Sequence, residues 1–247
     1  MAAPASDLVR ALRRHALEAD RLRFSAPVAF VYNPLRYARE PVERYFAQYA
    51  AGRKEVVFFG MNPGPWGMAQ TGVPFGEVAA ARDWLGITGR VAAPAAVHPR
   101  VPVRGFDCPR SEVSGRRLWS LMRDLFDDAR EWGRHWFVAN YCPLLFLDEA
   151  GRNITPDKLA ASDRSALFPV CDRFLSVLLE DLRPRWVVGV GAFARQRLEA
   201  VAPSLGIEIA SIPHPSPASP AANRGWAGQA KAALRSAGIR PAARSAG

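Results

Sequence analysis

Four short apolar runs, rich in β-branched and aromatic residues, are spaced along the chain. They are residues 55–60, 135–139, 185–190 and 206–212. Continuous apolar runs of this length are typical of strands that are buried on both faces of a sheet. The pattern therefore predicts four buried strands.

Amphipathic helical patterns alternate with these runs. They cover residues 114–126, 169–182, 192–201 and 225–237. Ser111 or Ser114 is available as an N-cap for the first of these helices, and Pro184 ends the second. The order β-α-β-α-β-α-β predicts a single α/β domain with a mostly parallel four-stranded sheet flanked by helices. In such sheets a ligand binds beyond the carboxyl ends of the strands.

The chain length and composition agree with one substantial core. Its 247 residues are 49% hydrophobic and 23% charged, as in ordinary globular proteins. We expect a helical extension over residues 1–25, a catalytic domain over 26–238 and a disordered tail over 239–247. No apolar segment approaches the roughly 20 residues of a membrane span, and the N-terminal segment lacks the apolar stretch of a signal peptide. The sequence therefore predicts a cytoplasmic protein without a membrane partner.

The cysteines and the charge limit the chemistry further. Cys108, Cys142 and Cys171 are too few for a disulfide framework or a four-cysteine metal site, so we expect free thiols. The formal net charge is +10. A basic excess favours a polyanionic partner such as nucleic acid, with an arginine-rich solvated surface as the alternative.

The positive charge is concentrated in two segments without acids. After residue 209 the basic residues are Arg224, Lys231, Arg235, Arg240 and Arg244. Within residues 85–106 they are Arg90, Arg100 and Arg104. These segments are the candidates for contact with a nucleic-acid backbone.

Candidate chemistry follows three of the predicted strands. The first strand leads into a glycine- and proline-rich loop that holds Asn62, Trp66 and Phe75 but lacks the signature of a phosphate-binding loop. Asn140 ends the second; its amide matches the O4/N3–H edge of a pyrimidine, although such an Asn is more often a turn former. His214 follows the fourth strand at the root of a proline-rich loop, where it is either catalytic or structural.

Long motifs in these loops resemble the single-strand-selective monofunctional uracil-DNA glycosylases, a branch of the uracil-DNA glycosylase superfamily. The three main motifs are GMNPGPWGMAQTGVPFGEV at 60–78, NYCPLLF at 140–146 and HPSPASPAANRGW at 214–226. Shorter ones are YNPLRYAREP at 32–41, RDWLGITG at 82–89, CPRSEVSGRR at 108–117 and GRNITP at 151–156. The resemblance covers roughly residues 30–235.

The resemblance implies hydrolytic excision of uracil and 5-hydroxymethyluracil from single- and double-stranded DNA, leaving an abasic site without a metal or cofactor. Asn62 matches the residue that positions the attacking water, and His214 matches the residue near O2 of the base. The Met61 N–H matches a backbone donor to the base. Phe75 matches the ring on which the flipped base stacks, and Asn140 the residue that reads its polar edge.

Specificity and DNA contact are also implied by the resemblance. Gly64 stands where the classical uracil-DNA glycosylases have Tyr, which predicts room for a polar 5-substituent beside the base. The DNA-contacting candidates are Gly151, Arg152, Asn153, Pro217, Ala218, Ser219, Arg224 and Lys231. Ala218 replaces an Arg that is frequent in the family, so we expect a preference for single-stranded or mismatched uracil. We expect a monomer, at the nucleoid of a bacterium or in the nucleus of a eukaryote.

Two other functions stay open at this point. A glycosylase that acts mainly on deaminated purines, hypoxanthine or xanthine, shares the same site chemistry. A non-catalytic nucleic-acid-binding domain explains the net charge of +10 but not the convergence of Asn62, Phe75, Asn140 and His214 on one edge of a sheet.

Overall fold

A four-stranded parallel sheet forms the centre of the molecule. The computed structural model describes residues 6–218 and 220–241. The strands are β2 (Val56–Gly60), β3 (Trp136–Asn140), β6 (Trp186–Val190) and β7 (Glu208–Ile212), in the order β3-β2-β6-β7. The predicted sheet is confirmed, because each apolar run is a strand within two residues of its expected ends.

A second, three-stranded antiparallel sheet was not predicted. It consists of β1 (Phe30–Tyr32), β4 (Leu145–Leu147) and β5 (Asn153–Ile154), in the order β1-β4-β5. These strands have only two or three residues each, which is too short for a period-two pattern to appear in the sequence. The sheet positions the loop between β4 and β5 close to the end of β3.

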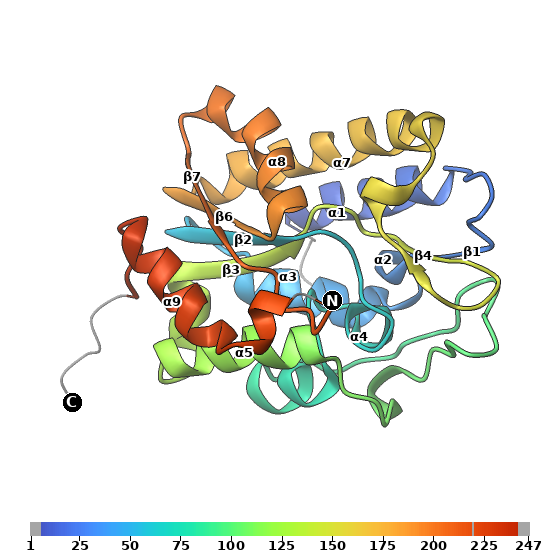
Figure 1. The fold of residues 1–247 in the computed structure, drawn as a ribbon, viewed down its shortest axis with the longest axis horizontal. Helices are drawn as coiled ribbons and strands as arrows, with labels where there is room; N and C mark the ends of the chain where they lie inside the picture. Colours follow the sequence, from blue (N-terminus) through green and yellow to red (C-terminus); the bar gives the residue numbers. More distant parts are fainter. Residues whose placement is uncertain (1–5, 219, 242–247) are drawn as a thin grey trace.

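Helices cover both faces of the parallel sheet, as predicted. The α-helices of the described chain are α1 (Asp7–Asp20), α2 (Pro34–Tyr37), α3 (Arg39–Tyr49), α4 (Met68–Thr71), α5 (Val113–Leu125), α6 (Ala129–His135), α7 (Ala161–Leu182), α8 (Ala192–Val201) and α9 (Trp226–Ser236). Figure 1 shows α1, α7 and α8 on one side of the sheet and α3, α5 and α9 on the other. The sequence patterns did not resolve α2, α3, α4 and α6.

Two expectations about helix ends are wrong. Helix α7 begins at Ala161, eight residues before the predicted start, and runs through Pro169. Its neighbours Leu167 and Cys171 are buried in the core, and this packing offsets the hydrogen bond that a proline removes. The N-cap of α5 is Glu112, not Ser111 or Ser114, and its side chain makes no capping bond within the described structure.

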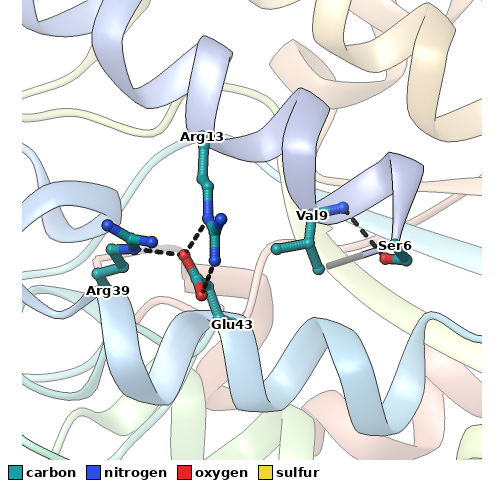
Figure 2. A network of polar contacts seen from close by, with 5 residues as sticks. All are labelled: Ser6, Val9, Arg13, Arg39 and Glu43. Carbon is teal, nitrogen blue, oxygen red and sulfur yellow. Dashed lines mark hydrogen bonds and ion pairs between the residues drawn. The ribbon is translucent and has the colours of Figure 1, made fainter. Parts of the chain in front are cut away.

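The N-terminal helix α1 is packed into the domain. Ser6 Oγ accepts the Val9 N–H at 3.3 Å and caps the helix. Figure 2 shows Arg13 of α1 donating two hydrogen bonds to the Glu43 carboxylate of α3, at 2.7 and 2.6 Å, with Arg39 on the same carboxylate. His15 stacks on Phe174 of α7 with ring centroids 4.5 Å apart. The helical extension is therefore part of the same core.

The end of the domain also extends beyond its expected boundary. Ile239 is buried, and its N–H donates to the Leu234 carbonyl at 2.9 Å. The packed segment thus reaches into the predicted tail, of which residues 242–247 lie outside the described structure. Cys108, Cys142 and Cys171 are free and buried. Among the described helices, none has the length and apolar character needed to cross a membrane.

Candidate active site

The predicted site residues meet in one cavity at the carboxyl ends of the parallel strands. Asn62 follows β2, Asn140 ends β3 and His214 follows β7, so the sheet brings their side chains to a common edge. The cavity has a volume of about 380 Å³. It is lined by Met61, Asn62, Gly64, Pro65, Trp66, Phe75, Glu112, Ser114, Asn140, Asn153, Thr155, His214 and Ser216.

An aromatic ring and an amide converge above the end of β2. Gly60 pairs with Asn140 in the sheet. A Cβ atom at Gly60 would lie 2.3 Å from Asn140 Oδ1 and 2.5 Å from Phe75 Cε2, so only glycine permits this approach. Asn140 Nδ2 lies 3.2 Å from the Met68 sulfur, while its buried Oδ1 has no hydrogen-bond partner among the described residues. An amide edge and a ring face are thus available to one planar ligand.

The Phe75 backbone is fixed in an uncommon conformation. Its φ of +53° lies in the left-handed region, which a non-glycine residue adopts only when its surroundings impose it. Trp119 Nε1 of α5 donates to the Phe75 carbonyl at 3.0 Å, and the Glu77 N–H donates to the same oxygen at 2.8 Å. The position of the ring is therefore set by helix α5 as well as by its own loop.

Asn62 is oriented by one hydrogen bond. Its Nδ2 donates to the Leu144 carbonyl at 3.2 Å, beside the start of β4. The same two loops are joined by the Cys142 N–H, which donates to the Met61 carbonyl at 2.9 Å. With Nδ2 engaged, Oδ1 is the group of this amide that is available to accept a hydrogen bond from a water molecule.

His214 is held as a neutral ring. The Ser216 N–H donates to Nδ1 at 3.1 Å, which leaves the ring proton on Nε2. Burial lowers the pKa of His214 from the ordinary value of 6.5, because desolvation disfavours the imidazolium form. The residue is thus a hydrogen-bond donor through Nε2 at neutral pH.

The loop after His214 is tied to α5 and α9. Arg117 of α5 donates to the Pro215 carbonyl at 2.8 Å and to Asn223 Oδ1 at 3.1 Å. Trp226 Nε1 donates to the Pro213 carbonyl at 2.8 Å. Pro217 and Ala218 are exposed beyond these ties. Of the other predicted DNA contacts in this loop, Ser219 lies outside the described residues.

The second predicted DNA-contacting loop joins β4 to β5. Asn153 lines the cavity, whereas Arg152 is exposed and paired with Asp148 at 2.7 Å. The Asp148 carboxylate also accepts the N–H groups of Ala150 and Arg152 at 2.9 Å. His98 closes against this loop, with Nε2 2.9 Å from the Glu149 carbonyl. Asp148 thus ties this turn together, and Gly151 and Arg152 directly precede Asn153 of the cavity lining.

The remaining predicted DNA contacts lie away from the cavity lining. Arg224 is exposed, and Lys231 of α9 forms an ion pair with Asp124 of α5 at 2.9 Å. The described chain contains no group of three His, Cys, Asp or Glu side chains arranged to hold a metal ion. The polar groups of the cavity are instead amides, hydroxyls, one imidazole and one carboxyl.

That carboxyl, Glu112, was missed by residue-level reasoning, although it lies in the motif at 108–117. Its Oε2 is buried without a hydrogen-bond partner in the part of the chain that is described. A Cβ atom at Gly64 would lie 1.9 Å from this oxygen. The volume that a side chain at position 64 would need is therefore occupied by the Glu112 carboxyl.

Comparison with known proteins identifies a family model and relatives that match most of the chain. A family model described as the uracil DNA glycosylase superfamily matches residues 46–235. A Rattus norvegicus protein named single-strand selective monofunctional uracil-DNA glycosylase is 49% identical over 226 residues, which cover 91% of this chain and 81% of the rat protein. A Bos taurus protein of the same name is 50% identical, over 91% of this chain and 83% of its own.

A solved structure shares the fold. Wild-type Pedobacter heparinus SMUG2 superposes with a TM-score of 0.65 and 14% sequence identity, over 92% of this chain and 97% of that chain. At this identity the likeness concerns the arrangement of helices and strands alone.

Proposed function

This chain belongs to the uracil-DNA glycosylase superfamily, and on that premise we propose that it hydrolyses the N-glycosidic bond of uracil and 5-hydroxymethyluracil in DNA. The observation that carries the proposal is the convergence of Asn62, Phe75, Asn140 and His214 on one cavity of about 380 Å³. A flipped pyrimidine has a face for the ring, a polar edge for the amide and a carbonyl for the imidazole. The product is an abasic site in an uncut strand.

The base is bound by stacking and edge recognition. Extrusion of a nucleotide costs a few kcal/mol, and stacking on Phe75 returns about 1–3 kcal/mol of it. The unpartnered Asn140 Oδ1 accepts from N3–H, and Nδ2 turns from the Met68 sulfur to O4. The Met61 N–H supplies a further donor to the base. A cytosine presents the opposite pattern at N3 and N4, so the same amide orientation rejects it.

Hydrolysis breaks the bond between C1′ and N1 and joins a water oxygen to C1′. Asn62 Oδ1 accepts a hydrogen bond from that water and aligns it, and because the amide is a weak base its contribution is mainly orientation. The water oxygen keeps one proton as the hydroxyl on C1′ and releases the other to solvent, and the departing uracil anion takes up a proton from solvent. The bonding electron pair leaves with the base and places negative charge on O2. The Nε2–H of His214 donates to this oxygen, and a preorganised donor of this kind lowers the barrier by about 3–4 kcal/mol.

DNA contacts flank the cavity in the proposal. Gly151, Arg152 and Asn153 lie on one side of the opening, and Pro217 and Ala218 lie on the loop that follows His214. Arg224 and Lys231 contribute positive charge that attracts the DNA backbone, Lys231 less than Arg224 because the Asp124 carboxylate partly neutralises it. Because Ala218 is small, we expect duplex opening to be inefficient and uracil in a single strand or a mismatch to be preferred.

A panel of oligonucleotides tests the proposal against both alternatives. Each carries one uracil, 5-hydroxymethyluracil, hypoxanthine, xanthine or thymine, single-stranded or paired, and alkali reveals abasic sites. We expect alkali-dependent breaks at uracil and 5-hydroxymethyluracil, and none with an Asn62→Ala/His214→Ala double variant. Faster excision of hypoxanthine or xanthine would identify a purine-lesion glycosylase. Binding without abasic sites would identify a non-catalytic domain.

A further inference from the structure

The Glu112 carboxyl lies on a wall of the cavity to which the proposed function assigns no contact with the base. Asn140 and His214 engage the edge of the base that carries O4, N3 and O2. The C5 edge of the same ring then faces the other wall, which Gly64, Trp66 and Glu112 form. Glu112 is the ionisable group on that wall.

The carboxyl is anchored but incompletely satisfied. Hydrogen bonding from the Trp66 and Gly67 N–H groups favours its ionised form, but burial dominates and raises the pKa of Glu112 to about 7. Both protonation states are therefore present near neutral pH. Its Oε2, pressed against Gly64, has no partner among the described residues. A buried polar atom without a partner is costly in a native protein unless a ligand satisfies it.

Building on the proposed function, we infer that Glu112 determines specificity at position 5 of the base, by hydrogen bonding the hydroxyl of a 5-hydroxymethyl group. Uracil has no 5-substituent and leaves space at this wall for a water molecule that satisfies the carboxyl, so uracil is accepted. The methyl group of thymine brings an apolar surface to a carboxyl that it cannot satisfy, and a site built around a hydrogen bond rejects such an analogue strongly. The expectation that Gly64 leaves open room for a 5-substituent is thereby corrected, because the space beside Gly64 holds the Glu112 carboxyl, and a 5-substituent on this side of the base meets that carboxyl.

The test compares two substrates in one enzyme. We expect Glu112→Ala to lower the ratio of kcat/KM for 5-hydroxymethyluracil to that for uracil about tenfold, the loss of one hydrogen bond. Glu112→Gln keeps a hydrogen-bonding group of the same size and restores part of the ratio. Asp163→Asn is the matched control, because Asp163 is a buried carboxyl of α7 that accepts the Ser25 N–H at 3.0 Å and does not line the cavity. It leaves the ratio unchanged.

A double-mutant cycle locates the effect at Gly64. A Cβ atom at this position overlaps the carboxyl at 1.9 Å, so Gly64→Ala displaces Glu112 and lowers the same ratio. The double variant Gly64→Ala/Glu112→Ala then loses no more than either single variant.

Each outcome has one meaning. An equal loss of kcat/KM on both substrates in Glu112→Ala and Glu112→Gln overturns the inference. Such a loss would mean that Glu112 supports the loop and does not recognise the substituent at position 5. Additive effects of the Gly64 and Glu112 changes overturn it as well. Absence of uracil excision by the wild-type protein contradicts the proposed function itself, before Glu112 is considered.

Discussion

The charge state of His214 is set by its own loop. The Ser216 N–H occupies Nδ1 at 3.1 Å, and burial lowers the pKa of the ring. Protonation at Nδ1 would place two N–H groups against each other. In the proposed mechanism, the neutral ring with its proton on Nε2 is therefore the form that donates to the leaving base.

We expect uracil excision to keep its neutral-pH rate as the pH falls to 6.5 and below, and to decline only when the lowered pKa of His214 is passed. The sign follows from the shift: a depressed pKa keeps the imidazole neutral to lower pH. The measurement is the single-turnover rate constant from pH 5 to 8 in the wild-type protein and in Glu112→Gln, because burial raises the pKa of Glu112 in the same cavity to about 7. An acidic decline centred at or above 6.5 in both proteins would contradict the assignment.

His214→Ala should reduce that rate about 100- to 1000-fold, the range for one lost donor to a developing anion. The acidic decline should disappear with the ring. His135→Ala is the control, because His135 ends α6 at the opposite, amino-terminal edge of the sheet.

The sequence predicts the site residues that follow parallel strands. It does not predict the site residues that other elements bring to the cavity. Asn62, Asn140 and His214 follow buried apolar runs, and parallel strands end at one edge. Phe75 came from the family resemblance. Glu112 approaches from the N-terminus of α5, and nothing in the local pattern indicates that its carboxyl turns toward Gly64.

At the scale of elements, the length of a strand determines whether the sequence predicts it. Runs of five apolar residues predicted β2, β3, β6 and β7, whereas the pairing of two or three residues in the antiparallel sheet depends on tertiary contacts. The sequence pattern predicts a helix start at Pro169, whereas α7 continues through this residue because its neighbours pack in the core. Helix α5 has a further task, because it braces the Phe75 loop through Trp119.

Gly115→Ala should show how closely α5 supports the site. The added Cβ would lie 2.2 Å from the Phe75 carbonyl oxygen, which is backbone and can only move with the loop. We expect a loss of about 1–3 kcal/mol in the free energy of unfolding and a 10- to roughly 100-fold slower uracil excision. Chemical denaturation and single-turnover kinetics measure the two effects.

The same substitution at Gly228 is the matched control. Gly228 lies within α9, and no described heavy atom comes within 4 Å of its Cβ position. Alanine there should stabilise the protein by about 0.5–1 kcal/mol with unchanged excision. If Gly115→Ala left Phe75-dependent excision intact, helix α5 would not be a support of the ring.

On the scale of the whole molecule, the net charge of +10 matters through its distribution. A hollow of about 240 Å³ adjoins the cavity that Asn62 and His214 line and shares Trp66 with it. It is lined by Arg100, Arg104 and Arg110, which are exposed, and within the described structure none of them has an ion-pair partner at 4 Å or less. Arg110 lies over the Trp66 ring at 3.8 Å. This hollow suits the phosphates of a strand whose base occupies the cavity.

Arg100→Ala/Arg104→Ala should therefore weaken binding of a single-stranded oligonucleotide and lower the slope of log K against log salt by about 1.4, as expected for two lost phosphate contacts. Arg53→Ala/Arg134→Ala removes the same charge from exposed positions just before β2 and β3, at the opposite edge of the sheet. This control pair should change affinity much less and leave the slope intact. Equal effects of the two pairs would mean that net charge, and not the hollow beside Trp66, supplies the DNA affinity.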